Sequence, residues 1–158
     1  NVTLDPCTAD PEFLKMSEDR KSITGLKGWS NKGSVLGCQM FSSGRHFWDV
    51  IVGVTGVWCV GVTSKLVNFK NVYEQTRQWQ IWEWEGQYTA VSPSKCFELV
   101  LSERPMRIRI SLNCEGGRVS FFDARTTALL HTFSDASLVG ETLLPYFYLG
   151  EGTWMTLP

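Results

Sequence analysis

Residues 106–112 alternate strictly between apolar and polar side chains, in the order Met-Arg-Ile-Arg-Ile-Ser-Leu. Successive side chains of a β-strand point to opposite faces, so this alternation predicts a strand with one buried and one solvated face. Gly116 and Gly117 follow, and glycine accepts the positive φ angles that tight turns require. The alternation resumes over residues 118–122, so the sequence predicts a β-hairpin over 106–122.

Short segments of this kind recur along the chain and are separated by turn residues such as Asp-Pro, Asn-Lys-Gly and Ser-Ser-Gly. No segment keeps a helical period over ten residues, although residues 13–21 are compatible with one helical turn. Many short strands in 158 residues favour a single all-β domain, an antiparallel sandwich of two sheets. The further predicted strands are 2–4, 13–16, 21–24, 35–40, 46–52, 57–62, 88–91, 97–101, 128–133, 143–149 and 153–157.

Three tryptophans within six residues, 79–84, do not share one face of a strand. Alternation places Trp79 and Ile81 on one face, and Gln80, Trp82 and Trp84 on the other. The first face is expected in the core. The second indicates a recognition surface, because tryptophan supplies contact area and an N–H donor; burial of both faces between two sheets is the alternative. The predicted core contains Trp48, Val50, Trp79, Met106, Ile108, Ile110, Leu112, Val119 and Phe121.

Composition narrows the function classes. A formal net charge of −1 argues against non-specific nucleic-acid binding, which needs a basic field. No apolar run is long enough to span a membrane. Five cysteines, without a C-x-x-C pair, argue against a disulfide framework and a zinc site and favour free thiols in a reducing cytoplasm. Because the chain begins at Asn1, it is expected to be a fragment of a longer protein.

Catalytic and cofactor motifs are missing, so no catalytic residue, metal or cofactor is predicted. His46 and His131 lie in expected strands and are interpreted as structural. No nucleophile elbow, dinucleotide loop or zinc-protease motif occurs. Glu83 and Glu85 share a strand face but are interpreted as a solvated strand end. Arg107 and Arg109, on one polar face, are possible anion ligands, although exposed arginines on a sheet are common.

Several ordered blocks resemble one family. Residues 2–6, 8–9 and 16–22 carry the leucine-aspartate-proline, threonine-alanine and serine-glutamate-aspartate elements of a PRY motif. Residues 41–50, the W-x-x-G-V-like strand 58–62, the hairpin 107–123 and residues 130–133 and 144–147 continue in matching order. The chain thus resembles a PRY-SPRY (B30.2) domain over essentially its whole length. The PRY part is expected over about 1–50 and the SPRY part over about 51–158, at the C-terminus of its parent.

The resemblance implies a bent, concanavalin-like β-sandwich with at most one or two short helical turns. It also implies a non-catalytic, cytoplasmic recognition module, which selects the target of a tripartite-motif (TRIM) E3 ubiquitin ligase with a RING domain, in innate immunity. The partner is expected to be a protein or peptide, with no nucleic acid or membrane contact, and the parent to be dimeric through a coiled coil outside this chain. The expected partner-binding residues are Trp29, Cys59, Phe69, Tyr73, Arg77, Trp82, Trp84, Tyr88 and Leu138.

Two alternatives stay open at this point. A butyrophilin-type domain would sense a small phosphorylated metabolite through a basic pocket, yet the corresponding strand offers Trp82, Glu83 and Trp84. A glycan-binding sandwich would also use aromatic platforms, although the cysteine pattern disfavours an extracellular role. The chain departs from the usual family pattern in its short segment between Ser22 and Val35, and in Cys59 and Asn113. Its partner therefore does not follow from any one member.

Overall fold

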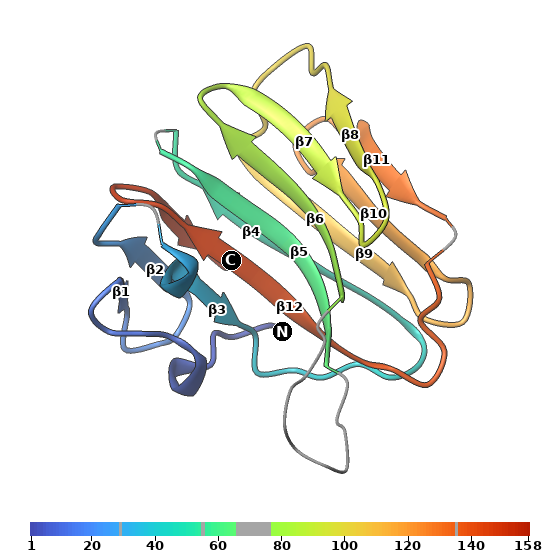
Figure 1. The fold of residues 1–158 in the computed structure, drawn as a ribbon, viewed down its shortest axis with the longest axis horizontal. Coiled ribbons are helices and arrows are strands. Elements are labelled where there is room, and N and C mark those ends of the chain that lie inside the picture. The colour runs from blue at the N-terminus through green and yellow to red at the C-terminus, as the bar shows by residue number, and fades with distance from the viewer. Residues whose placement is uncertain (29, 55, 66–76, 135) are drawn as a thin grey trace.

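A computed structural model describes residues 1–28, 30–54, 56–65, 77–134 and 136–158. Within these residues the chain forms two antiparallel sheets that pack face to face (Figure 1). The seven-stranded sheet has the order β1 (Leu14–Met16), β2 (Ser22–Gly25), β13 (Trp154–Thr156), β4 (Arg45–Val52), β9 (Arg107–Asn113), β10 (Arg118–Asp123) and β11 (Leu129–Phe133). The six-stranded sheet has the order β3 (Ser34–Leu36), β12 (Thr142–Leu149), β5 (Trp58–Lys65), β6 (Arg77–Trp84), β7 (Gln87–Val91) and β8 (Cys96–Leu99).

The predicted all-β sandwich is confirmed, and most predicted strands lie within one or two residues of the observed ones. Residues 2–4 contribute only the isolated bridge between Leu4 and Gly37. The helical turn considered over 13–21 is wrong, because that segment forms β1 and a turn. The short helical turns that the described residues contain are two 3-10 helices, η1 (Pro6–Thr8) and η2 (Asn31–Gly33).

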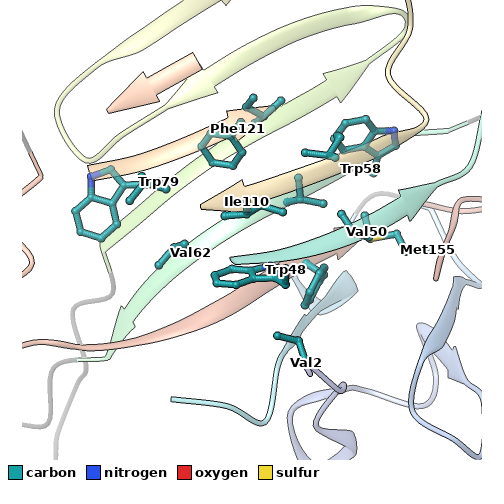
Figure 2. Close-up of a cluster of buried hydrophobic side chains, with 14 of the residues drawn as sticks. Val2, Trp48, Val50, Trp58, Val62, Trp79, Ile110, Phe121 and Met155 are labelled. Atoms are coloured by element: carbon teal, nitrogen blue, oxygen red, sulfur yellow. The ribbon is translucent and has the colours of Figure 1, made fainter. Parts of the chain in front are cut away.

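The core fills the space between the sheets. Figure 2 shows Trp79 and Val62 on the inner face of the six-stranded sheet and Trp48, Ile110 and Phe121 on the facing strands. The nine residues predicted for the core are buried except Met106, whose surface is 40% exposed. Met106 lies one residue before β9 begins; its carbonyl still accepts a hydrogen bond from the Val52 N–H at 2.9 Å, but its side chain does not belong to the core cluster.

A two-residue turn fixes how β6 and β7 pair. Glu85 and Gly86 both have positive φ, at 50° and 79°. Two such residues form the turn whose twist matches that of antiparallel strands. The turn pairs Trp84 with Gln87, and the register then continues to Gln80 opposite Val91. It therefore decides which side chains of β6 face outward.

All five cysteines are free thiols, with Cys59 and Cys114 buried and the other three exposed. In the part of the chain that the structure describes, no helix has the length and apolar character needed to cross a membrane.

Candidate recognition surface

The tryptophan-rich strand β6 has two distinct faces, as the alternation predicts. Trp79 and Ile81 belong to the core cluster, at 3% and 0% exposure. Trp82 is half-buried and Trp84 is exposed, and neither belongs to that cluster. The alternative that both faces are buried between sheets is therefore wrong. We call the outer side of the six-stranded sheet the aromatic face; its central side chains are Gln78, Gln80, Trp82, Trp84, Tyr146 and Tyr148, of which Gln80 and Tyr148 are themselves buried.

Strand register brings a row of outward side chains together from three strands. Tyr148 of β12 is opposite Cys59 of β5, which is opposite Trp82 of β6. The rings of Trp82 and Tyr148 lie 5.1 Å apart between centroids. The small Cys59 side chain is fully buried beneath them, and burial raises the pKa of its thiol well above the usual value. Cys59 thus supports the two rings as a neutral thiol rather than as a reactive thiolate.

A chain of side-chain hydrogen bonds runs along the aromatic face. The Trp82 indole donates from Nε1 to Oε1 of Gln80 at 2.7 Å, and the Gln80 amide donates in turn to Oε1 of Gln78. This holds the Trp82 ring in one orientation. The Gln78 side chain ends the chain beside a hollow of about 350 Å³, which Gln78 and Gln80 line together with Arg77 and residues 91–93. Apart from Arg77, whose charge is paired with Glu141, this hollow offers the neutral amide groups of the two glutamines.

Two further contacts attach loops to this sheet. The Tyr148 hydroxyl accepts a hydrogen bond from the Ser30 backbone N–H at 3.3 Å, so it anchors the segment before β3. The neighbouring Tyr146 lies at the centre of the β12 row, where burial raises the pKa of its hydroxyl. Tyr146 therefore stays neutral at physiological pH, and Tyr148 attaches the segment before β3 to the sheet.

Arg77, one of the expected partner-binding residues, makes its contacts within the domain. Its guanidinium pairs with the Glu141 carboxylate, donates to the Ser137 carbonyl at 2.7 Å and lies over the Trp79 ring at 5.3 Å. Because Glu141 is largely buried, this pair attaches the segment before β12 to the end of β6. Arg77 therefore positions a loop, and its charge is already matched within the domain.

Tyr88 and Leu138 are not at the surface, although both were expected to contact a partner. Leu138 is 1% exposed and Tyr88 is 8% exposed, and both belong to the core cluster. Tyr88 alternates onto the inner face of β7, opposite Glu83. Burial, and then the nearby Glu83 charge, raise the pKa of Tyr88 to about 12. Trp29, Phe69 and Tyr73 lie outside the described residues.

Glu83 also differs from the solvated strand end that the sequence suggests. Its carboxylate is 1% exposed and pairs with Arg104 at 2.5 Å. Burial raises the pKa of Glu83, and the Arg104 charge together with the Trp58 indole and Tyr88 hydroxyl offsets only part of that rise. Glu83 therefore closes one end of the core and is separated from Glu85, which occupies the turn.

Sequence reasoning placed Gln80 on this face and missed Gln78, Tyr146 and Tyr148. Alternation within the predicted strand 143–149 was a usable signal, since Phe147 lies in the core and its two neighbours must point outward. The meeting of Tyr148 with Trp82 depends on the order of strands in the sheet, which this alternation alone does not specify.

The anion that Arg107 and Arg109 bind is a carboxylate of the domain itself. Arg109 donates to Asp49 Oδ1 from Nε at 2.7 Å, and Arg107 donates from Nε to Oδ2 at 2.9 Å. Burial alone would raise the pKa of Asp49, but hydrogen bonds and charges from both arginines outweigh it, so that pKa is lowered below 3.8. The pair thus secures β4 to β9.

In Asp49→Asn, the free energy of unfolding is expected to decrease less steeply as the pH is lowered. A lowered native pKa stabilises the fold above the unfolded value of 3.8, and that contribution disappears as pH falls through the native pKa. Denaturant unfolding followed from neutral pH into strong acid should show a steeper decline for the wild type than for Asp49→Asn. Glu12→Gln, which removes an exposed ion pair with Lys27, should keep the wild-type slope. Parallel curves for wild type and Asp49→Asn would contradict this account.

The two antiparallel sheets form a β-sandwich with an aromatic outer face. The family model described as SPRY domain matches residues 45–157. The chain belongs to the SPRY domain family, and the resemblance to a PRY-SPRY domain is confirmed.

Curated relatives place such a domain in two kinds of protein. E3 ubiquitin-protein ligase TRIM58 of Mus musculus is 33% identical over 100% of this chain and 35% of its own length. Butyrophilin subfamily 2 member A2 of Mus musculus is 36% identical over 96% of this chain and 31% of its own. The chain spans about a third of these relatives, and the homology is consistent with a recognition module.

Solved structures confirm the architecture. The TRIM65 PSpry domain aligns with a TM-score of 0.78 at 22% identity, covering 100% of this chain and 90% of that one. Stonustoxin aligns with a TM-score of 0.77 at 24% identity, covering 99% of this chain and 27% of its own. At these identities the likeness shows the fold alone.

Proposed function

We propose that this domain is a cytoplasmic, non-catalytic recognition module that binds a protein target through the aromatic face, and that it selects the target of a TRIM-type E3 ubiquitin ligase. The observation that carries the proposal is the half-buried Trp82, whose ring packs at a tilt against Tyr148 and is oriented by Gln80. Oriented aromatic rings at the centre of a surface are typical anchors of protein interfaces. The similarity to TRIM58 supports the ligase context, and the free thiols support a reducing compartment.

The chemistry of the face indicates which kind of target fits. The central row of Tyr148, Cys59, Trp82 and Thr89 is uncharged, and Glu98 of β8 follows it at the edge of the sheet. At the end of the hydrogen-bonded chain, the Gln78 amide donors suit a carbonyl oxygen of a partner chain. An uncharged peptide segment with an apolar side chain for the tryptophans therefore fits this face better than a phosphorylated metabolite, which requires cationic ligands.

Trp82→Ala is expected to weaken target binding by about 2 kcal/mol, which is roughly thirtyfold in Kd. Trp84→Ala should act in the same direction. Wild-type and variant domains, immobilised and exposed to a cell lysate, would be compared by quantitative mass spectrometry of the retained proteins. The affinity for a retained protein would then be measured by calorimetry. Trp154→Ala is the matched control, because Trp154 is 44% exposed and Trp84 is 46% exposed, on opposite sheets.

Thermal unfolding of the same variants distinguishes lost contact from lost folding. Trp84→Ala should change the free energy of unfolding by no more than about 0.5 kcal/mol. Trp82→Ala should lower it by about 1 kcal/mol, because Trp82 is half-buried. If folded Trp82→Ala and Trp84→Ala domains retain the same proteins as the wild type, the aromatic face is not the target site. Tight binding of inorganic pyrophosphate that depends on Trp82 would instead favour a metabolite sensor.

A further inference from the structure

The outer face of the seven-stranded sheet differs sharply in charge from the aromatic face. The inner residues of β4, β9 and β10 belong to the core, as Figure 2 shows for Trp48, Ile110 and Phe121, so the alternate residues point outward. We call this outward set the arginine face. In order of register it consists of Arg45, Asn113 and Arg118; Phe47, Ser111 and Ser120; Asp49, Arg109 and Phe122; and Ile51 and Arg107.

Four arginines and one aspartate give the arginine face an excess of positive charge, although the whole chain has a net charge of −1. Half of the chain's eight arginines lie in this small region. Glu115, at the adjoining hairpin turn, directs both carboxylate oxygens to the Gly44 backbone N–H. The positive charge is therefore concentrated on one side of the domain.

The arginines at the centre are held in fixed orientations. Asp49 accepts from Nε of both Arg107 and Arg109, and the Arg109 guanidinium lies over the Phe47 ring at 4.6 Å. The two guanidinium side chains nevertheless stay 41% and 46% exposed, and the Phe47 ring is 65% exposed. Ordering these side chains on binding would cost little entropy, because the protein has already restricted them.

A surface hollow of about 520 Å³ runs beside this cluster and is lined by Arg45, Phe47, Asp49, Arg107 and Arg109, among others. Arg45 and Arg118 flank Asn113 in the row beyond it and are both exposed. Among the described residues, no acidic side chain pairs with either of them. Arg45 also lines the hollow, whereas Arg118 lies on β10, so both charges are available to a segment that occupies the hollow and extends across β9.

We propose that the arginine face is a second docking surface, separate from the aromatic face, and that it binds an acidic polypeptide segment carrying an apolar side chain. Arginine and aromatic residues are enriched in protein interfaces, and guanidinium groups bind carboxylates in a bidentate manner. Phe47 and Phe122 supply apolar contacts that a nucleic-acid backbone would not use. Asp49 within the face and the negative charge of the whole chain also disfavour a phosphate polymer.

The test uses the 158-residue domain and a fluorescein-labelled peptide of glutamates and phenylalanines, with a lysine-phenylalanine peptide of equal length for comparison. Fluorescence anisotropy should show saturable binding of the glutamate peptide only, and the affinity should fall as salt is raised. The double variant Arg45→Glu, Arg118→Glu should weaken binding by about tenfold or more. The control is Arg20→Glu, Lys95→Glu, which makes the same charge change at exposed sites elsewhere and should bind nearly as the wild type does.

Each remaining outcome bears on the proposal. Glutamate-peptide binding that survives Trp82→Ala supports a separate surface, whereas its loss in that variant would place the peptide on the aromatic face and overturn the proposal without affecting the proposed target site. Equal weakening in both double variants would show that binding depends on the net charge of the domain and not on the arginine face, and would overturn the proposal. No measurable binding of the glutamate peptide, or tighter binding of single-stranded RNA or anionic phosphatidylserine vesicles, would also overturn it.

Discussion

Replacing Trp79 with alanine is expected to lower the free energy of unfolding by about 3–5 kcal/mol. Trp79 is 3% exposed and lies between the two sheets (Figure 2). Truncation would remove a large apolar surface from the core and leave a cavity that rigid strands on both sides cannot close. It would also remove the ring under the Arg77 guanidinium. Guanidinium chloride unfolding followed by far-UV circular dichroism measures the change.

Trp84→Ala is the control for this experiment, because the two tryptophans lie on the same strand and face in opposite directions. Its free energy of unfolding should stay within about 0.5 kcal/mol of the wild type. A loss below about 1 kcal/mol for Trp79→Ala would be incompatible with a fully packed core position.

Gly61→Ala is expected to destabilise the domain by about 3 kcal/mol or more, at the upper end of the range for overpacking. A Cβ at this position would lie 2.1 Å from the Trp79 carbonyl oxygen and 2.8 Å from the Gln80 Cα. Both are backbone atoms of the paired strand β6, so no side-chain movement relieves the collision. The variant must either separate β5 from β6 or lose ladder hydrogen bonds between them.

The same change should disturb the aromatic face, since Gly61 is opposite Gln80 and the hydrogen-bonded chain from Trp82 passes through that glutamine. Urea unfolding, together with the two-dimensional NMR shift of the Trp82 indole N–H, would report both effects. Gly28→Ala is the control, because no atom lies within 4 Å of an added Cβ there. Wild-type stability in Gly61→Ala would show that β5 and β6 are less tightly paired than described.

The sequence was sufficient for the fold and for the two faces of β6, because period-two alternation over 79–84 and 106–112 directly reports burial. It was insufficient where the burial of a side chain depends on the end of a strand or on contacts with distant residues. Met106 continues an apolar pattern beyond the ladder, and Glu83 reads as polar although Arg104 allows its burial. Tyr88 was assigned to the surface by its nearness to the tryptophans, although its alternation within β7 places it inside.

The aromatic face itself is a product of sheet order. Tyr148 is 66 positions from Trp82 in the sequence, and only the placement of β5 between β12 and β6 brings their rings together. The resemblance to PRY-SPRY domains supplied the architecture without the side-chain partners. The role found for Arg77, which attaches the Glu141 segment, likewise depends on a loop conformation that local pattern does not encode.

The turn at Glu85 and Gly86 sets the register of β6, and this register decides which of its side chains lie in the core and which lie on the aromatic face. Shifting the register of the whole strand by one residue would exchange the two sets: Trp82 and Trp84 would enter the core, and Trp79 and Ile81 would meet solvent. Such a shift in β6 is therefore incompatible with the packed core, which contains Trp79 and Ile81. New binding preferences in a domain built this way must arise by substitution at even positions of this strand or by altered length in the loops around it.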